Sequence, residues 1–553
     1  IHSESLDTKT PLLKAMHAVS KYGIRLLRLL GNTTSRRVLS YVGPEQEYFL
    51  IPEDLYEQRP DLKFSGRTLF GAMPPKGQEM SDQYFGDIRE KVKKFMSDVD
   101  EQLWKLGITA KTQHNEVAPC QHEIAPIFSV SNVALDNNYL VMNVLKKTAK
   151  KYGLVCLLHE KPFDGINGSG KHNNWSLTTD DGINLFKPGK EPENNKVFQL
   201  VLACLMSAVD KHAVLLRTAA SNTGNDHRLG ANEAPPAIIS IYLGDQVGDV
   251  VDQIIKTGKA TSSLHSGVID FGINKLPVLE KDPTDRNRTS PFAFTGNRFE
   301  FRMVASSNSI GDTNTVLSAM MAEAFADAID ALTGAEDLDK AVEEYTLKLM
   351  REHERIIFNG NGYTDEWLEE AKKRGLYNLV STPDALPHFI DEKNERLLTS
   401  HHIFTDAELH SRYEIKMENY VKTLHIEANT LVEIIQKDLL PSITTYMEKL
   451  AQTASLKKSV VPGISVSAEA SLLSRLTELA ETMTKDLETL KADTAMAEYE
   501  VDKDLLKSAK LYQSVVLTDM EKVRVSADAA EALIPDSILP YPTYGKLLFS
   551  ISD

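Results

Sequence analysis

Two glutamates stand close together in an otherwise apolar segment, YVGPEQEYFLI (41–51). Side chains at positions i and i+2 of a strand lie on the same face, so Glu45 and Glu47 would present two carboxylates side by side. On a half-buried strand such a pair is usually solvated. The alternative is that the carboxylates bind a divalent cation, and such a site would need further ligands from other parts of the chain.

A second pair of acids follows in HNEVAPCQHEIAPIF (114–128), where Glu116 and Glu123 flank Pro119. Two strands joined by a turn would aim both carboxylates inward. By itself this pair is weak support for a metal site.

A glycine-rich loop precedes a histidine in KPFDGINGSGKHNNWSL (161–177). Gly165, Gly168 and Gly170 let a backbone approach a ligand closely, and His172 follows at the start of a predicted strand. The glycines could equally form a simple turn, and a single histidine is more often a core residue than a ligand.

Charges also alternate with phenylalanines in NRTSPFAFTGNRFEFRM (287–303). Arg298, Glu300 and Arg302 share one face of the predicted strand, which could be a structural ion-pair ladder. Arg288 lies nearby, and Arg228 stands in NDHRLGANEAPP. Arginines near acids suit a site that binds a metal together with phosphate or carboxylate groups.

Length and composition limit the class of protein. The chain has 553 residues, 42% hydrophobic and 25% charged, with a net charge of −16, which indicates two or three globular units and disfavours nucleic acid as a partner. Cys120, Cys156 and Cys204 form neither a disulfide framework nor a metal motif, which favours a reducing, cytoplasmic setting. The N-terminus lacks a signal layout, and the apolar runs read as too short to span a membrane.

The order of elements predicts an α+β fold with a large, mainly antiparallel sheet. An amphipathic helix is predicted over residues 9–30, and short apolar runs alternate with Gly, Pro and Asn from about residue 38 to about residue 310. The predicted strands are RRVLSYVG, HEIAPIFSV, GLVCLLHE, NNWSLTTD, AIISIYLG and RFEFRMVA.

Beyond about residue 310 the chain is rich in Ala, Leu, Glu and Lys and is predicted to be helical. Apolar residues recurring between Leu472 and Leu490 predict a helix-packing seam of a bundle core. The stretch 453–467 (TASLKKSVVPGISVS) predicts a break between helices. The final PYPTYGKLLFSISD predicts a tail that docks onto the body.

Taken together, the motifs NEVAPCQHEIAPIF, NGSGKHNNWSL and NRTSPFAFTGNRFEFR resemble those of glutamine synthetase, in its type III branch. The resemblance covers about residues 40–310 at the level of motifs. It implies a helical lead-in (1–37), a catalytic domain (38–400) with a curved antiparallel sheet, and a helical C-terminal region (401–553). The β-grasp domain that begins the family's chains, and that supplies an ammonium-site Asp, is not among these residues.

The resemblance assigns a role to each acid. In the family, acids line a funnel that holds two divalent cations, Mg²⁺ or Mn²⁺. By motif position Glu47, Glu116 and Glu123 would bind the first cation, and Glu45, His172 and Glu300 the second. One imidazole among oxygen ligands favours Mn²⁺ slightly.

Substrate roles carry over in the same way. Asn167, Gly168 and Arg228 would bind glutamate, and Phe128, Ser176 and Arg298 would bind the nucleotide. Arg288 and Arg302 would stabilise the transferring phosphoryl group, and Glu233 would be the flap acid that closes the site. Glu233 could otherwise be an ordinary loop residue.

Two positions depart from the type I pattern. Ala293 stands where those enzymes have a phosphate-binding arginine, and Asn174 stands where they have a histidine near the nucleotide. One phosphate contact must therefore be absent or supplied differently, and the nucleotide contact at Asn174 is in doubt.

The resemblance implies that glutamine is formed from glutamate, ammonia and ATP through γ-glutamyl phosphate. It also implies a homo-oligomer, a dodecamer of two hexameric rings, with no membrane partner. Two alternatives remain: a ligase that joins glutamate to another amine such as a polyamine, and a structural relative without catalysis. The complete set of ligand-type residues argues against the last.

Overall fold

The computed structural model describes residues 5–230, 234–264, 268–269, 279–280 and 289–551. Its strands are β1 (Val38–Pro52), β2 (Ala110–Asn115), β3 (Gln121–Pro126), β4 (Ser129–Val130), β5 (Leu154–Leu157), β6 (Gly170–Thr179), β7 (Ile241–Tyr242), β8 (Val268–Ile269), β9 (Leu279–Glu280), β10 (Phe292–Phe294) and β11 (Phe299–Ala305).

The helices of the first part of the chain are α1 (Lys9–Leu29), α2 (Glu53–Tyr56), α3 (Pro60–Ser65), α4 (Glu90–Lys105), α5 (Ser131–Lys151), α6 (Lys196–Thr218), α7 (Thr223–Arg228), α8 (Gly244–Thr257), α9 (Gly311–Leu332) and α10 (Leu338–Glu352). The later helices are α11 (Asp365–Lys373), α12 (Thr382–Ala385), α13 (Glu392–Ser400), α14 (Asp406–Ile434), α15 (Leu440–Val460), α16 (Ser467–Tyr499), α17 (Leu505–Leu511), α18 (Leu517–Glu531) and α19 (Tyr544–Phe549).

The large sheet is built around the long strand β1. Its strand order is β2-β3-β1-β6-β11-β10-β7, and β4 and β5 also pair with β1. Every pairing in this sheet is antiparallel except that of β10 with β7. This confirms the predicted α+β fold with a mainly antiparallel sheet.

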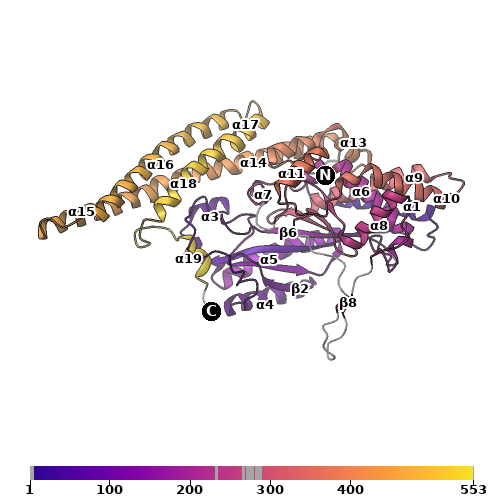
Figure 1. Cartoon of the computed structure of the whole chain (residues 1–553), viewed down its shortest axis with the longest axis horizontal. Helices are drawn as coiled ribbons and strands as arrows, with labels where there is room; N and C mark the ends of the chain where they lie inside the picture. Colours follow the sequence, from indigo (N-terminus) through magenta and orange to yellow (C-terminus); the bar gives the residue numbers. More distant parts are fainter. Residues whose placement is uncertain (1–4, 231–233, 265–267, 270–278, 281–288, 552–553) are drawn as a thin grey trace.

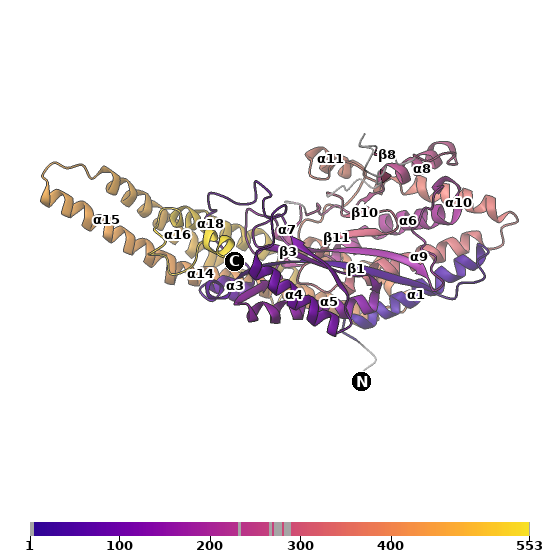
Figure 2. The same cartoon turned by 90° about the horizontal axis from the view of Figure 1, so that it is seen from below.

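Alternation along the strands gives the sheet one apolar and one polar face. Val38 and Val42 of β1 are buried in the main core with Trp175 of β6, whereas Glu45 and Glu47 lie on the opposite face of β1. Helices α1, α5 and α9 contribute to this core, and Figure 2 shows α1, α4 and α5 along one side of the sheet. The polar face is therefore free to carry a site.

Helix α1 confirms the helix predicted over residues 9–30. It buries Leu12, Ala15 and Val19 and packs against α9 and β1. A Cβ at Gly23 would lie 3.0 Å from Cγ2 of Val38, so the small residue lets the helix approach the sheet closely. The lead-in is thus part of the main core, and the predicted boundary at residues 37/38 stays a prediction.

Helix α6 corrects the expectation that every apolar run is too short to span a membrane. By length and composition alone it could cross a membrane, but 78% of its most apolar window is buried inside the protein. It packs against α9 and α10. The helix is therefore explained as a core helix.

The C-terminal helices form a long arm, seen at the left of Figure 1. Helix α14 continues into α15 through a π-helical turn (Ile435–Leu439), and α16 runs back along α15. Leu476, Met483, Leu487 and Leu490 are buried, which confirms the predicted packing seam.

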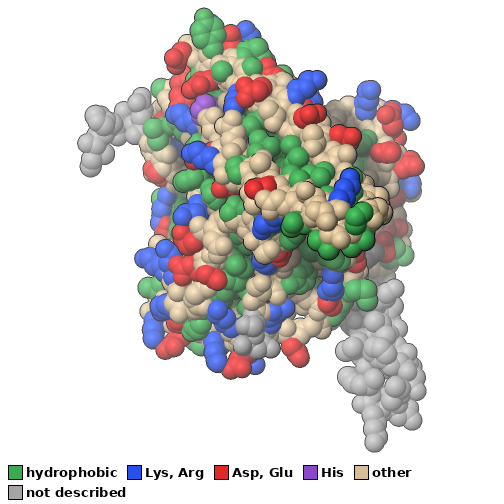
Figure 3. Space-filling model, turned by 90° about the vertical axis from the view of Figure 1, so that its left-hand side faces the viewer, with side chains coloured by type: hydrophobic (Ala, Val, Ile, Leu, Met, Phe, Trp, Pro, Cys, Tyr) green, Lys and Arg blue, Asp and Glu red, His purple; other side chains and the backbone are tan. Residues whose placement is uncertain are grey.

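The predicted break at 453–467 is partly wrong. Helix α15 continues to Val460, because Ala, Leu and Lys in this stretch favour helix, and the break is confined to residues 461–466, which contain Pro462 and Gly463. Near this end of the arm Leu456 and Val460 expose 65% and 77% of their surface. Figure 3 views the molecule from this side and shows hydrophobic side chains gathered between charged ones.

The predicted docking of the C-terminal tail is confirmed. Leu547, Leu548 and Ile551 are buried in a second core together with Phe49 and Leu50 of β1. Helix α19 contacts both α2 and β1. The tail thus returns from the arm to the strand that carries the paired glutamates, while the boundary at residues 400/401 stays a prediction.

Candidate active site

Strand register brings the candidate ligands onto one face of the sheet. Glu45 of β1 is the direct partner of His172 of β6, and Glu47 is the direct partner of Glu123 of β3. Glu300 of β11 lies opposite Asn174 of β6. Segments separated by up to about 250 residues of sequence are thereby assembled into one acidic cluster.

The predicted second metal set is in direct contact. Nδ1 of His172 lies 3.2 Å from Oε2 of Glu45 and 3.0 Å from Oε1 of Glu300. The other oxygen of Glu300 accepts two hydrogen bonds from Arg302, at 3.0 and 2.7 Å. The predicted Arg302 is therefore held in place by a metal-ligand candidate.

These contacts shift the pKa of both partners. Burial opposes protonation of His172, but the charges and hydrogen bonds of Glu300 and Glu45 outweigh it and raise the histidine pKa well above its usual value. Burial likewise opposes ionisation of Glu300, yet His172 and Arg302 hold the Glu300 pKa well below its usual range. The imidazolium neutralises carboxylates that would otherwise repel one another.

The predicted first metal set is crowded with negative charge. Burial and the charge of Glu116 raise the pKa of Glu47 to about 7, although Oε2 of Glu47 accepts a hydrogen bond from the Gly170 N–H at 2.7 Å. Burial and the charges of Glu45 and Glu47 raise the pKa of Glu123. Carboxylates that resist ionisation because of one another are stabilised by a cation between them, so the donor set fits a divalent metal.

The sequence reasoning missed His114. Its Nε2 lies 3.0 Å from Oε1 of Glu123, and its Nδ1 lies 3.6 Å from Oε1 of Glu116. The hydrogen bond to Glu123 raises the His114 pKa to about 9. The sequence contained a signal for this role. His114 stands two residues before Glu116 near the end of a strand, and side chains at this spacing lie on the same face of an extended chain.

On this face, two groups of described side chains each offer ligand atoms within 4.8 Å of one another: Glu45, Glu123 and His172, and His114, Glu116 and Glu123. All six predicted metal ligands thus lie on or beside one polar face. The division of these ligands between two cations stays a prediction.

The glycines of the loop before β6 allow close contacts with other parts of the protein, and their predicted close approach to a ligand stays a prediction. A Cβ at Gly168 would collide with the carbonyl oxygen of Glu160, and a Cβ at Gly170 would collide with the guanidinium of Arg228. Arg228 is buried, and it donates to Oδ1 of Asn225 at 3.3 Å and to the carbonyl of Arg302 at 3.4 Å. Burial lowers the Arg228 pKa.

Asn167 is fixed by a second residue that the sequence reasoning missed, Gln78. Its side chain accepts from the Asn167 N–H at 2.8 Å and donates to Oδ1 of Asn167 at 2.7 Å. The structure thus brings Gly168 beside Arg228 and orients Asn167, while their contact with glutamate stays a prediction.

Two predicted nucleotide-binding residues, Phe128 and Ser176, both lie next to Tyr41. The Tyr41 ring lies 6.0 Å from the ring of Phe128, and Ser176 is the direct partner of Tyr41 across β1 and β6. Phe128 exposes 59% of its surface, as an aromatic stacking platform would. Arg298 lies just before β11 and is exposed.

The two departures from the type I pattern have structural consequences. Asn174 donates to Oε1 of Glu45 at 2.8 Å and to the carbonyl of Gly43 at 3.2 Å, so it supports a metal-ligand candidate. Ala293 is buried in β10 directly opposite Glu300, so no side chain at this position can supply the phosphate contact. Glu233 and Arg288 lie outside the described residues.

Comparison with known proteins identifies the family. A family model described as the glutamine synthetase catalytic domain matches residues 25–239, and one described as the glutamine synthetase C-terminal domain matches residues 341–458. A glutamine synthetase of Butyrivibrio fibrisolvens is 48% identical over 99% of this chain and 78% of that protein.

Two further relatives match almost the whole chain. The type-3 glutamine synthetase of Dictyostelium discoideum is 43% identical over 99% of this chain and 75% of that protein. A glutamine synthetase of Bacteroides fragilis is 39% identical over 99% of this chain and 76% of that protein. The chain therefore belongs to the glutamine synthetase family, the ATP-dependent ligases that form glutamine from glutamate and ammonia.

Proposed function

We propose that the polar face of the sheet is the catalytic funnel of a glutamate–ammonia ligase that works through γ-glutamyl phosphate. The observation that carries the proposal is the register of β3, β1 and β6, which sets Glu47 against Glu123 and Glu45 against His172. The family uses ATP and divalent metal. The finer assignment, two Mg²⁺ or Mn²⁺ ions bound by the six predicted ligands, rests on motif positions and on the crowded carboxylates.

Charge explains why this chemistry needs such a site. A carboxylate must attack the γ-phosphorus of ATP, so two anions have to meet, and bound cations offset that repulsion as Lewis acids. Arg228 is proposed to hold a carboxylate of glutamate, beside Asn167 and Gly168. Arg302, Arg288 and Arg298 are proposed to neutralise charge on the transferring phosphoryl group and on the nucleotide.

The orientation of Arg302 supports its proposed role. Its two hydrogen bonds to Glu300 hold the guanidinium beside the funnel before any substrate arrives. A donor that is already oriented costs no reorganisation when charge develops in the transition state.

The second step needs neutral ammonia, which forms when ammonium loses a proton, and a site closed to water. Ammonia attacks the carbonyl carbon of the γ-glutamyl phosphate, the C–O bond to phosphate breaks, and phosphate leaves. Glu233 is proposed to accept the proton that the attacking nitrogen releases and to close the site against hydrolysis.

The nitrogen donor is tested with a panel of amines. Purified protein with glutamate, ATP and Mg²⁺ or Mn²⁺ is supplied with ammonia, a polyamine or a small alkylamine, and ADP release and amide product are both measured. Product with ammonia alone supports the proposal. Efficient product only with another amine would favour the glutamate–amine ligase, and no ADP release with any donor would favour the non-catalytic relative.

Assembly and location extend the proposal. Members of the family form oligomers, and the dodecamer of two hexameric rings in the cytoplasm is proposed for this chain. The exposed apolar side chains of the arm, Leu456 and Val460, support association with other copies. Light scattering on the purified protein measures the mass of the assembly, and a fully active monomer would contradict the proposal.

A further inference from the structure

The loop that is proposed to bind glutamate packs against the C-terminal end of the chain. We define the substrate loop as residues 161–170 and the tail as residues 541–551. Tyr544 of the tail is fully buried, and its ring lies 5.6 Å from the ring of Phe163 in the substrate loop. Two segments far apart in sequence therefore share one core.

The hydroxyl of Tyr544 is the centre of this contact. It accepts hydrogen bonds from the Asp164 N–H at 3.4 Å and from Nη2 of Arg524 at 3.2 Å. The same oxygen lies 2.6 Å from Oγ1 of Thr68. Arg524 also lies 3.6 Å from the carboxylate of Asp164, so α18 and α19 act on the same loop residue.

Thr68 continues the contact to the start of the loop. Its Oγ1 donates to the carbonyl of Pro162 at 2.8 Å, and its N–H donates to the same carbonyl at 2.9 Å. Because the threonine proton is used on Pro162, the Tyr544 hydroxyl must donate to Oγ1 of Thr68. A continuous chain of hydrogen bonds thus runs from Tyr544 through Thr68 to Pro162.

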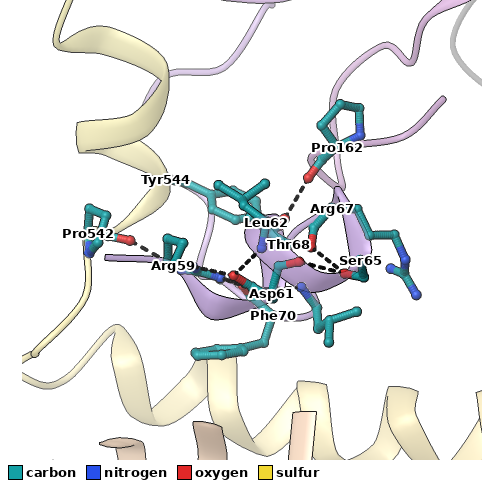
Figure 4. A network of polar contacts seen from close by, with 12 residues as sticks. Arg59, Asp61, Leu62, Ser65, Arg67, Thr68, Phe70, Pro162, Pro542 and Tyr544 are labelled. Atoms are coloured by element: carbon teal, nitrogen blue, oxygen red, sulfur yellow. Dashed lines mark hydrogen bonds and ion pairs between the residues drawn. The ribbon is translucent and has the colours of Figure 1, made fainter. Parts of the chain in front are cut away.

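The tail itself is fixed by a buried arginine. Figure 4 shows Arg59 between Asp61, Phe70 and Pro542, beside Thr68 and Tyr544. Arg59 donates to the carbonyl of Pro542 at 3.1 Å and to that of Phe70 at 2.8 Å, and it pairs with Asp61. Such a fully buried and fully paired network favours one fixed arrangement over several loose ones.

Helix α18 adds a second attachment. Asp528 accepts from the Gly71 N–H at 2.6 Å, and Glu531 accepts from the Ala72 N–H at 2.9 Å. A Cβ at Gly71 would collide with the ring of Tyr544, so the glycine makes room for the tail. The C-terminal region and the substrate loop are therefore bound to the same short segment, residues 68–72.

We infer that Tyr544 is a positioning residue for the glutamate site. Its hydroxyl bonds the Asp164 N–H directly and Pro162 through Thr68, which fixes the start of the substrate loop, whereas Gln78 bonds Asn167 farther along the same loop. The inference rests on the proposed roles of Asn167 and Gly168. The C-terminal helices are then part of what sets the affinity for glutamate, although they contribute no group that touches it.

The test removes only the hydroxyl. In Tyr544→Phe the buried ring is kept, and the loss of the hydroxyl's hydrogen bonds to Thr68, Asp164 and Arg524 is expected to raise the KM for glutamate by about five- to tenfold. The KM for ATP and kcat are expected to change by less than about twofold, because the funnel and the nucleotide residues are untouched. Hydrogen–deuterium exchange of the substrate loop is expected to become faster.

A matched control is Tyr512→Phe. Tyr512 is also fully buried in the C-terminal region, and its hydroxyl is 2.8 Å from Nδ1 of His425, away from the substrate loop. This variant also loses a tyrosine hydroxyl and its hydrogen bond while keeping the buried ring, and it is expected to leave the KM for glutamate and loop exchange unchanged. A second variant, Thr68→Val, breaks the same chain from its other end and is expected to reproduce the effect of Tyr544→Phe without adding to it in the double variant.

The outcomes separate the two proposals. An unchanged KM for glutamate and unchanged loop exchange in Tyr544→Phe overturn the positioning role while wild-type glutamine synthesis stands. Equal changes in Tyr544→Phe and Tyr512→Phe also overturn it, because they reveal only a loss of general stability. If the wild-type protein releases no ADP with glutamate and ammonia, the proposed function fails, and loop exchange in the variants still tests the positioning.

Discussion

Glu45 and His172 face each other directly across the antiparallel pairing of β1 and β6, with Oε2 of Glu45 3.2 Å from Nδ1 of His172. This relationship depends on register, because a slip of one residue would turn either side chain to the core face. The apolar partners on that face, including Val42 and Trp175, are fully buried and oppose such a slip. The core thus fixes the metal-ligand candidates as pairs.

The first prediction concerns Glu45. Glu45→Gln is expected to lower glutamine formation by about 100-fold or more, because a neutral amide is a poor ligand for a hard cation. Stability should change little, since Glu45 is only half-buried and belongs to a crowded acidic cluster. Steady-state kinetics and thermal unfolding check both expectations, and a variant with full activity would contradict the metal assignment.

Glu300→Gln is the informative contrast. Glu300 is buried and pairs with Arg302 and His172, so its loss leaves a buried guanidinium and a partly buried imidazolium poorly compensated. Activity should fall as in Glu45→Gln, and stability should also fall, by on the order of 3 kcal/mol. Equal thermal stability of the two variants would show that the pair with Arg302 does not stabilise the fold.

The second prediction concerns His114. His114→Gln is expected to raise the Mg²⁺ or Mn²⁺ concentration for half-maximal activity by about tenfold or more, because the imidazole orients or joins the ligands Glu116 and Glu123. His122→Gln is the control, since His122 lies on the other face of β3 and bonds Asn115. A similar metal requirement in both variants would show that His114 has no part in the site.

The third prediction concerns Glu233, which lies outside the described residues. If it guards the intermediate, Glu233→Ala should keep part of the ATP cleavage while glutamine formation falls sharply, because water then hydrolyses the acyl phosphate. The measurement is the ratio of ADP released to glutamine formed. Equal amounts of both products at an unchanged rate would make Glu233 an ordinary loop residue.

The fourth prediction concerns pH and Asp226 of α7. Burial raises the pKa of Asp226 to about 7, despite Arg217 and the two hydrogen bonds from Thr382. Because the folded pKa lies above the unfolded value of 3.8, folded protein binds the extra proton between these values. This group therefore stabilises the fold fully below the unfolded pKa, and that contribution is lost as pH rises through about 7.

Wild type and Asp226→Asn should consequently diverge with pH. Between about pH 5 and about pH 8 the unfolding free energy of wild type should fall relative to that of the variant by up to about 1.4 kcal/mol per pH unit. The melting temperature of wild type should fall in parallel. Asp384→Asn is the control. Although burial opposes it, the hydrogen bonds of Lys510 and Ser381 lower the Asp384 pKa, so its contribution is lost only in acid. Parallel pH curves for wild type and Asp226→Asn would contradict the prediction.

Local pattern was enough to predict several parts of the fold. The alternation in β1, the glycines before β6 and the leucine seam of α16 each specify a face or a close approach within one element. The expectation about apolar runs failed at α6, because the burial of that helix depends on helices that are distant in sequence. Helix α6 is long and mostly apolar because most of it lies inside the core, where α9 and α10 pack against it.

The sequence by itself determined which residues could bind a cation or a phosphate, because ligand chemistry belongs to the side chain and strand alternation is local. Only the tertiary structure decided that Glu45 meets His172, that His114 joins Glu116 and Glu123, and that Tyr544 lies against Phe163. These contacts join segments up to several hundred residues apart. Their register follows from the packing of whole faces, a sum over many buried side chains that no single segment of sequence contains.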